Sequence, residues 1–427
     1  MIIANGKIYR SEEQDRILAA AAHNIDRTLA ERSLDAETVI AAIDRLGSEI
    51  ARGVFDERIN ELPVDEPMRY KAMAAEMLSR EFLEYKLAVE LGGSEPENAP
   101  ENAAFTRIMP LGVIFHIAAG NMDGLPAFSL AEGLLTGNIN ILKLPRADNG
   151  LSVEIIAKLI EYEPRLADFI YVFDTPSSDV HAMKKMAALA DGIAVWGGDG
   201  AVSAVRALAP VGTRLIEWGH KLSFAYISGY EDKERELTEL AAHIAATKQL
   251  LCSSCQVIYL DTDDESELEG FCAEFLPILE REIARRKPVS IGGRAHSSLL
   301  RYTDMLEDIL GEKPLPKHFG GKGCSLTIGA DSELELSDMM CNVLVKKLPR
   351  RGIVPVLRRG KNYLQTAGLI CPESERAELA DIFARCGVTR VTSAGAMSDY
   401  FAGEGHDGDY PLRRYTRVVN TSFDWRR

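Results

Sequence analysis

The spacing of hydrophobic residues changes near residue 107 and divides the chain into two kinds of segment. Before this point apolar residues recur at helical intervals, as in the Ala- and Leu-rich run from Arg16 to Leu29. After it, short apolar runs alternate with amphipathic segments of helix length, such as strand-like Val113 to Ala118 and helix-like Pro126 to Leu135. Strands joined by single helices of this length need crossover connections, so the pattern predicts a doubly wound, mostly parallel α/β sheet.

The same alternation resumes later in the chain and predicts a second α/β domain. Ser266 to Arg285 has helical length and spacing, and Val343 to Leu348 is typical of a strand. Tyr415 to Thr421 is strand-like and isolated from any helix, which suits an arm that pairs with an edge in another domain or subunit. We therefore expect N-terminal helices and a first α/β domain in residues 1–226, a second α/β domain in 227–400, and a C-terminal strand in 401–427.

The composition excludes several classes of protein. A formal net charge of −15 over 427 residues disfavours nonspecific attraction to nucleic acid, so no nucleic-acid partner is expected. No apolar run is long enough to cross a bilayer, and Met1 to Arg10 lacks the features of a signal peptide, so we expect a cytoplasmic protein without a membrane span. The seven cysteines, an odd number between Cys252 and Cys386, are expected to be reduced thiols.

A thiol-bearing turn stands between helical Leu237 to Lys248 and the apolar run Val257 to Leu260. Its cysteines, Cys252 and Cys255, have CxxC spacing, which is typical of redox dithiols and of half a zinc site. A second CxxC is missing from the sequence, and a strand rather than a helix follows the pair. The pattern favours one reactive thiol with a bystander, although two small buried side chains are an equally common state of cysteines.

Several polar residues follow predicted strands of the first domain, where α/β sheets bind their ligands. Lys143 and Arg146 come after one strand and suggest an anion, with solvated surface residues as the alternative. Gly197 and Gly198 come between a strand and a helix, where a backbone can approach a pyrophosphate, although the spacing is not GxGxxG and a plain turn is as common. No metal-ligand set is predicted.

Two further polar residues are candidates for catalysis. Asn121 follows a strand and Gly120, so its side-chain N–H could form one arm of an oxyanion hole, whereas an ordinary turn asparagine is more frequent. Glu217 ends a strand and is either a base or an ion-pair partner of Lys221.

The order of these signals resembles the aldehyde dehydrogenase superfamily. Arg107 to Pro145 is similar to its segment from the oxyanion asparagine to the cofactor-ribose lysine, and Leu215 to Lys221 is similar to its glutamate motif, 35 residues before Cys252. The closer resemblance, covering Arg107 to Val419, is to the LuxC-like acyl-CoA reductase family. It is carried by His116 to Asn121, Cys252-Ser253-Ser254, Gln365-Thr366 and Gly405-His406-Asp407-Gly408. Cys255 stands where the family is expected to have a proline. The choice of Cys252 rather than Cys255 as the nucleophile therefore rests on the motif match.

The resemblance implies an aldehyde dehydrogenase-like fold and reduction of an acyl-CoA to an aldehyde. Cys252 would attack the thioester and carry the acyl group, with Asn121 and the Cys252 backbone N–H holding the oxyanion. A nicotinamide bound through Lys143, Gly197 and Gly198 would deliver hydride in the first domain, which makes the second domain the catalytic one. Glu217 would have a modest role, because hydrolysis would waste the intermediate.

The family resemblance also bears on cofactor choice and assembly. Arg146 stands where NAD-specific relatives place a glutamate, and a guanidinium suits a 2′-phosphate, so NADPH is expected, with NAD as the alternative. The terminal strand implies a homo-oligomer. Other readings remain open: an aldehyde-oxidising or acyl-phosphate-reducing enzyme of the same fold, a non-catalytic nucleotide-binding subunit, or a CxxC zinc or redox protein. His406 is interpreted as structural.

Overall fold

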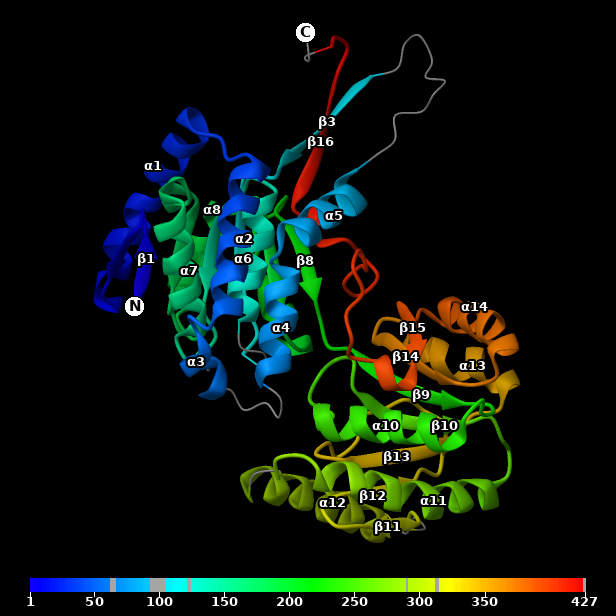
Figure 1. The fold of residues 1–427 in the computed structure, drawn as a ribbon. Coiled ribbons are helices and arrows are strands. Elements are labelled where there is room, and N and C mark those ends of the chain that lie inside the picture. The colour runs from blue at the N-terminus through cyan, green and yellow to red at the C-terminus, as the bar shows by residue number, and fades with distance from the viewer. Residues whose placement is uncertain are drawn as a thin grey trace. The chain divides into compact units, whose positions relative to one another are not determined.

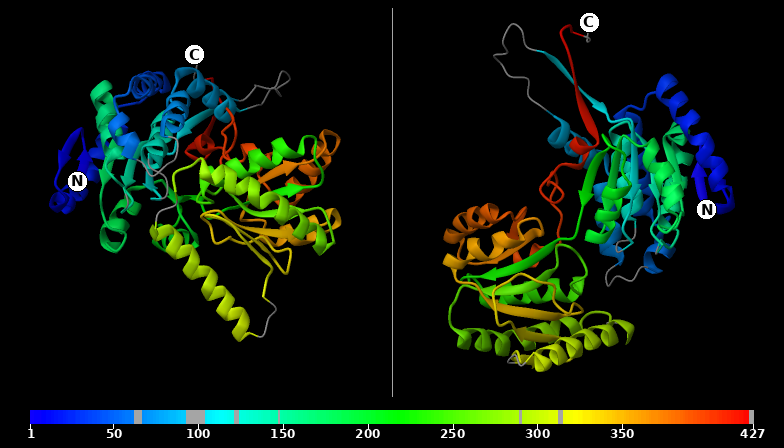
Figure 2. Two further views of the ribbon diagram at one scale, coloured as in Figure 1. Left: turned by 60° about the horizontal axis from the view of Figure 1, so that its bottom comes forward. Right: turned by 180° about the vertical axis from the view of Figure 1, so that it is seen from behind.

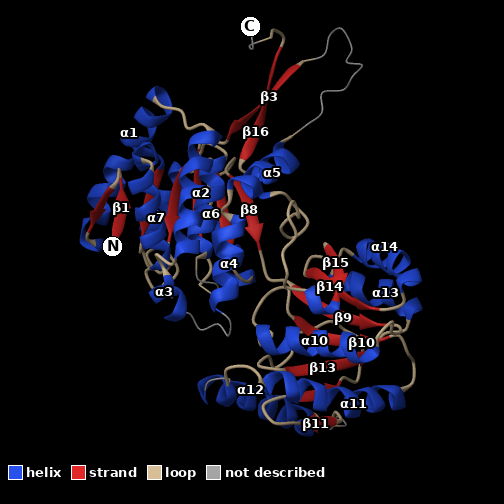
Figure 3. Ribbon diagram, in the orientation of Figure 1, coloured by secondary structure: helices blue, strands red, loops and turns tan. Residues whose placement is uncertain are grey.

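The computed structural model describes residues 1–61, 67–92, 104–120, 124–146, 148–288, 291–311 and 315–424. It divides into two units, of which the first comprises Met1–Gly219 with Phe401–Arg427 and the second comprises His220–Tyr400. Figure 1 gives the labels of their elements, and Figure 3 shows that the strands of each sheet are flanked by helices. Each unit is built around its own seven-stranded sheet.

The sheet of the first unit has the order β2-β1-β6-β5-β4-β7-β8. Strands β4 to β8 run parallel, and the N-terminal strands β1 and β2 add an antiparallel edge. The strands are β1 (Ile2–Ala4), β2 (Lys7–Tyr9), β4 (Val113–Ile117), β5 (Ile139–Lys143), β6 (Ile170–Phe173), β7 (Gly192–Trp196) and β8 (Arg214–Trp218).

Helices cover both faces of this sheet because the chain reverses its direction of travel across it. Helices α6 and α7 join β4 to β5 and β5 to β6 in one direction, while α8 and α9 lead back past β4 to β7 and β8. Right-handed crossovers place these two pairs on opposite faces. The helices of the unit are α1 (Gln14–Glu31), α2 (Ala36–Arg52), α3 (Asp56–Glu61), α4 (Pro67–Met77), α5 (Arg80–Leu91), α6 (Leu125–Leu135), α7 (Leu151–Tyr162), α8 (Val180–Leu189), α9 (Asp199–Leu208) and α15 (Pro411–Arg414).

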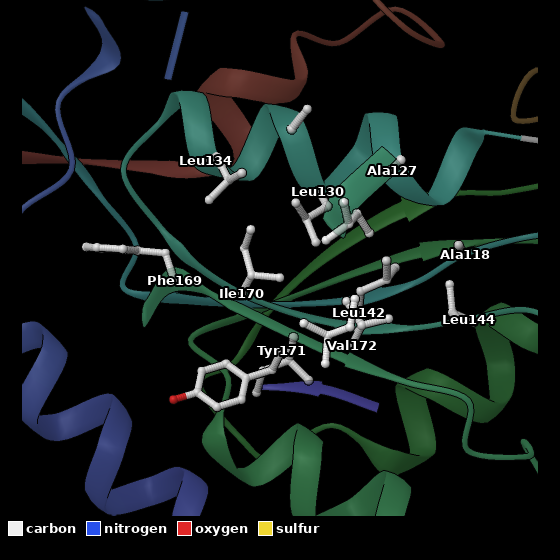
Figure 4. Close-up of a cluster of buried hydrophobic side chains, with 14 of the residues drawn as sticks. Ala118, Ala127, Leu130, Leu134, Leu142, Leu144, Phe169, Ile170, Tyr171 and Val172 are labelled. Atoms are coloured by element: carbon white, nitrogen blue, oxygen red, sulfur yellow. The ribbon is translucent and has the colours of Figure 1, made fainter. Parts of the chain in front are cut away.

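The core of the first unit follows from alternation along the strands. Figure 4 shows Leu130 and Leu134 of α6 above strand residues Leu142 and Val172, while the Tyr171 ring points away from α6. These side chains are at most 1% exposed. A strand places successive side chains on opposite faces, so β6 contributes to the core on both sides of the sheet.

The C-terminal segment completes the first unit. Leu412 and Tyr415 are fully buried, and Tyr415 packs with Trp218 in a cluster on β7 and β8. Beyond it, β16 (Thr416–Thr421) pairs antiparallel with β3 (Phe105–Pro110). The resulting two-stranded ribbon extends away from its unit in Figure 1 and in the right view of Figure 2. The strand that was expected to pair with another domain or subunit therefore has a partner within its own unit.

The sheet of the second unit has the order β11-β12-β13-β10-β9-β14-β15, with only β11 antiparallel. Two apolar clusters fill its two faces, one under α10 and α11 and the other under α13 and α14. The elements are β9 (Leu222–Ile227), α10 (Lys233–Thr247), β10 (Cys255–Leu260), α11 (Glu265–Ala284), α12 (Ile291–Leu310), β11 (His318–Gly320), β12 (Ser325–Ile328), β13 (Asn342–Lys347), α13 (Ile353–Leu357), β14 (Leu364–Ile370), α14 (Arg376–Cys386) and β15 (Arg390–Ser393).

The boundary between the units differs from the one expected after residue 226. Strand β9 was assigned to the first domain, but it pairs with β10 and β14 at the centre of the second sheet. The unit boundary therefore lies at Gly219. The cause is that β8 and β9 follow one another along the chain with no helix between them, and apolar spacing alone does not reveal which sheet a strand joins.

Candidate active site

The predicted nucleophile lies in the second unit, just after helix α10. This helix ends at Thr247; its C-cap residue, Lys248, has a left-handed backbone (φ 49°), and Gln249 repeats that conformation (φ 63°). Left-handed residues cost roughly 1–2 kcal/mol each when they carry a side chain, so other contacts must compensate. The buried Gln249 amide donates to the Cys255 carbonyl at 3.0 Å and to Ser337 Oγ at 2.8 Å. These bonds fix the path of the chain into the turn.

Cys252 lies in a tight turn that this network supports. The backbone N–H of Ser254 donates to the Leu251 carbonyl at 3.0 Å, which places Cys252 and Ser253 at the centre of the turn. Cys252 is exposed. Ser253 Oγ lies 2.8 Å from Ser398 Oγ, and that contact joins the turn to the segment after β15.

The neighbouring Cys255 has a different environment, although CxxC spacing links the two residues. It is fully buried as the first residue of β10, and this burial raises the pKa of its thiol to about 12. A buried, protonated thiol is a poor nucleophile. The other five cysteines are buried as well. Cys252 is therefore the exposed thiol of the chain, which supports it over Cys255 as the nucleophile.

The predicted cofactor residues lie at the carboxyl ends of strands in the first unit. The chain leaves β4 toward β5 on one side and later returns to β7 on the other, so the order of strands reverses between β4 and β7. Doubly wound sheets bind ligands in the crevice at such a switch point. β4, β5 and β7 are the strands that the predicted residues Asn121, Lys143, Gly197 and Gly198 follow or end.

Lys143 is the last residue of β5 and is 5% exposed. Its Nζ donates to Ser177 Oγ at 2.8 Å, and burial lowers the pKa of the amine. Arg146 is exposed in the turn that follows β5. The Lys143 side chain is thus held in place, whereas Arg146 is an exposed residue.

Gly197 and Gly198 connect β7 to helix α9. A Cβ atom added at Gly198 would meet nothing within 4 Å, and its φ of −72° is open to any residue. Neither the backbone conformation nor internal packing therefore requires glycine at this position. Open space above a backbone at a helix N-terminus is what close approach of a pyrophosphate needs.

Asn121, the predicted oxyanion donor, lies outside the described residues. The strand before it, β4, and the helix after it, α6, are both described.

Glu217 forms an ion pair with Arg206, a residue that the sequence did not suggest. Its two carboxylate oxygens accept from Arg206 Nε and Arg206 Nη2, each at 2.6 Å. This contact raises the pKa of the Arg206 guanidinium. Lys221 instead donates to the Asn362 carbonyl at 2.9 Å and belongs to the second unit. Glu217 thus has an ion-pair partner within its own unit, and its place among the catalytic residues stays a prediction.

His406 lies against two indole rings. Its ring centre is 4.9 Å from those of both Trp196 and Trp218, at the ends of β7 and β8. The contact attaches the C-terminal segment to the first sheet, as a structural residue would. Neither Arg206 nor the buried tail residues Leu412 and Tyr415 were predicted from the sequence. Their spacing along the chain gave no signal for these contacts.

Among the residues that the structure describes, no group of three or more His, Cys, Asp or Glu side chains is arranged to hold a metal ion. Within the same residues, every helix is too short or too polar to cross a membrane.

Comparison with known protein families identifies the chain. The model of the acyl-CoA reductase (LuxC) family matches residues 32–418. The chain belongs to this family. The matched range of this LuxC-family chain includes Cys252 and all six other predicted site residues.

Curated relatives of the LuxC-family chain are named long-chain acyl-protein thioester reductases. That of Vibrio harveyi is 25% identical over 337 residues, which cover 78% of this chain and 69% of the relative. That of Photorhabdus luminescens is 23% identical over 326 residues, covering 75% and 66%. The chain thus matches about two thirds of the length of these relatives.

Solved structures establish the fold of the LuxC-family chain. An indole-3-acetaldehyde dehydrogenase in complex with NAD+ has a TM-score of 0.71 at 15% identity, covering 96% of this chain and 88% of that one. A lactaldehyde dehydrogenase from Escherichia coli has a TM-score of 0.67 at 14% identity, covering 97% and 92%. The expected aldehyde dehydrogenase-like architecture of two α/β domains is confirmed.

Proposed function

We propose that this chain reduces an acyl-CoA to the aldehyde through an acyl thioester on Cys252, with NADPH as the hydride donor. The observation that carries the proposal is the exposed Cys252 in a hydrogen-bonded turn, beside a Cys255 that is buried and protonated. Family membership and the relatives' names, which specify thioester reductases, support the reaction class.

The nucleophilic step needs only groups of this chain and the substrate. Cys252, as thiolate, attacks the acyl carbonyl, and the new C–S bond replaces the one to the leaving thiol, which takes up a proton. The Cys252 backbone N–H and the Asn121 side chain would hold the oxyanion, a contribution worth about 2.7–4 kcal/mol per donor in other enzymes. Acyl-CoA and an acyl-protein present the same carbonyl, so the chemistry at Cys252 is common to both.

The first unit fits a dinucleotide. A strand-order reversal, a helix N-terminus with open space at Gly198, and a buried lysine at the end of β5 are the features that such a ligand uses. Lys143 would hold a ribose hydroxyl, and the exposed Arg146 would bind the 2′-phosphate that distinguishes NADPH. A nicotinamide held by these residues would supply the hydride that converts the Cys252 thioester to the aldehyde. Glu217, whose carboxylate is engaged by Arg206, would have a modest role.

Intact-mass spectrometry tests the acyl-cysteine. Incubation with a panel of acyl-CoAs, and with an acylated carrier protein, should add the acyl mass to the wild type and to Cys255→Ser but not to Cys252→Ser. Acylation that persists in Cys252→Ser and is lost in Cys255→Ser would move the nucleophile. Acylation by the carrier protein alone would assign the substrate as an acyl-protein, and no added mass from any donor would refute the proposal.

Replacing Arg146 with glutamate tests the cofactor. The carboxylate would repel a 2′-phosphate and accept from a ribose hydroxyl, so the preference should shift toward NADH. The measurement is kcat/KM for each cofactor, with Arg165→Glu, an exposed site in the same unit, as the control. Unchanged ratios in Arg146→Glu would remove Arg146 from the cofactor site.

We also propose that the protein works as a homo-oligomer in the cytoplasm. The ribbon of β3 and β16 supports assembly, because each strand has one edge not paired in that sheet and such edges recruit further strands. The seven thiols suit a reducing compartment. Light scattering on the purified chain should give a multiple of 47.0 kDa; a monomer at micromolar concentration would contradict the oligomer.

A further inference from the structure

Strand β9 carries a fully buried serine at the point where both neighbouring strands lose register. Ser223 lies opposite Cys255 of β10, but the next residue of β9, Phe224, lies opposite Val257. On the other side, Leu222 lies opposite Leu364 of β14 and Phe224 lies opposite Ala367. Both neighbours therefore carry extra residues beside Ser223. Such bulges leave backbone groups without their regular ladder partners.

The Ser223 hydroxyl bonds to backbone groups on both sides. It accepts from the Thr366 backbone N–H at 3.0 Å and donates its proton to the Cys252 carbonyl at 2.7 Å. The second bond reaches from β9, an interior strand of the sheet, to the exposed thiol turn. Linked bonds of this kind polarise one another in a buried site, so the pair is stronger than two isolated contacts.

We propose that Ser223 is a positioning residue for the Cys252 nucleophile. Fixing the Cys252 carbonyl fixes the peptide plane between Cys252 and Ser253, and this limits the directions in which the Cys252 side chain and its own N–H point. The Ser253–Ser398 contact restrains the turn from its other side. Near-attack geometry is sensitive to displacements of about 1 Å, so a looser turn slows acylation without weakening substrate binding. The inference rests on the proposed role of Cys252.

Ser325 offers a matched control within the same sheet. It is also buried, at 1% exposure, and it is the first residue of β12, as Ser223 is the second residue of β9. Its hydroxyl donates to Asn342 Oδ1 at 2.7 Å, and β13 separates its strand from β10. Removing the Ser325 hydroxyl deletes one buried hydrogen bond of the second unit and removing the Ser223 hydroxyl deletes two, and of these two residues only Ser223 bonds to the thiol turn.

The experiment compares Ser223→Ala, Ser325→Ala and the hydroxyl-retaining Ser223→Thr by thermal unfolding, hydrogen exchange and acylation. Both alanine variants should lower the melting temperature. Only Ser223→Ala should speed amide exchange in residues 250–256 and lower the rate of acylation about tenfold at unchanged KM, with Ser223→Thr recovering part of the rate.

Two results would overturn the positioning role. The first is exchange in residues 250–256 that matches the wild type, because the turn would then be held without Ser223. The second is faster exchange with an unchanged acylation rate, because the bond would then be structural only. A wild type that no acyl donor acylates would instead refute the proposed function, while the exchange measurement would still report whether Ser223 holds the turn.

Discussion

The first sheet carries its candidate ligand residues at the carboxyl ends of its strands, whereas the second carries Cys252 at the amino end of β10. The first arrangement follows the general rule for doubly wound sheets, in which strand ends and helix N-termini together make a binding edge. The amino end of β10 in the second sheet does not have this combination of strand ends and helix N-termini. Three local features hold the turn that exposes the Cys252 thiol: the left-handed residues at the end of α10, the hydrogen bonds of buried Gln249, and the bond from Ser223 beside the bulge. The predicted cofactor edge thus follows from the topology of its sheet, whereas the exposure of Cys252 depends on particular side chains.

The largest expected effect is the difference in reactivity between Cys252 and the buried cysteines. In the native protein, iodoacetamide should modify Cys252 at least about a hundredfold faster than any of the six buried cysteines, since only an accessible thiol can react as thiolate. Peptide mapping at short labelling times measures each rate, and labelling in denaturant is the control. Comparable modification of Cys255 would mean that the turn before β10 does not separate the two thiols.

Acid should destabilise both units through one buried histidine each. Burial lowers the pKa of His116 to about 4, and burial followed by the charge of Arg390 lowers the pKa of His243 to about 4. The unfolded chain binds these protons near pH 6.5, so it is favoured as the pH falls. The free energy of unfolding should therefore not vary with pH through these histidines above pH 6.5. It should decline from pH 6.5 toward pH 4 by roughly 1.4 kcal/mol per pH unit for each histidine.

Variants His116→Gln and His243→Gln test this separately for each unit. Each should reduce the slope of unfolding free energy against pH between 4 and 6.5, whatever its effect on stability at neutral pH. Fluorescence of Trp196 and Trp218 reports on the first unit, which holds His116. Slopes equal to that of the wild type would show that these histidines do not govern the acid response.

Gly198→Val, after β7, should weaken binding of NADPH much more than it lowers the stability of the first unit. The added side chain meets no protein atom within 4 Å of its Cβ, and the less favourable N-cap of α9 should lower the melting temperature by only about 2–4 °C. Affinity for NADPH should fall about tenfold if the ligand approaches that backbone. Titration calorimetry measures it, and Gly270→Val, equally open on α11, is the control. Unchanged affinity would place the cofactor elsewhere.

Glu217→Gln should have the smallest effect. Its carboxylate is already bound twice by Arg206, and thioester reduction needs no base to activate water, so turnover should fall only severalfold. Steady-state kinetics over a pH series is the measurement. A loss of a thousandfold or more would make Glu217 a principal catalytic group.

Much of the fold could be predicted from the sequence, because alternating apolar runs and helices determine a doubly wound sheet. The membership of β9 could not, since Leu222–Ile227 has the same apolar spacing whichever sheet it joins. The contacts of Ser223 also could not be predicted: its partners lie 29 and 143 residues away in sequence. Cys252 was predicted as the nucleophile from its turn and its motif. That Cys252 is exposed while Cys255 is buried depends on where β10 begins, which the sequence pattern did not show.

The C-terminal segment has a consequence for biosynthesis. The second unit interrupts the first in sequence; Tyr415 completes the apolar cluster on β7 and β8, and Leu412 packs into the larger core of the same unit. During translation the second unit emerges whole before these two residues are made. The first unit begins earlier, but Tyr415 can join its apolar cluster on β7 and β8 only after the whole second unit has been made. A chain ending at residue 400 should therefore lose protease resistance in its first unit while the second stays intact.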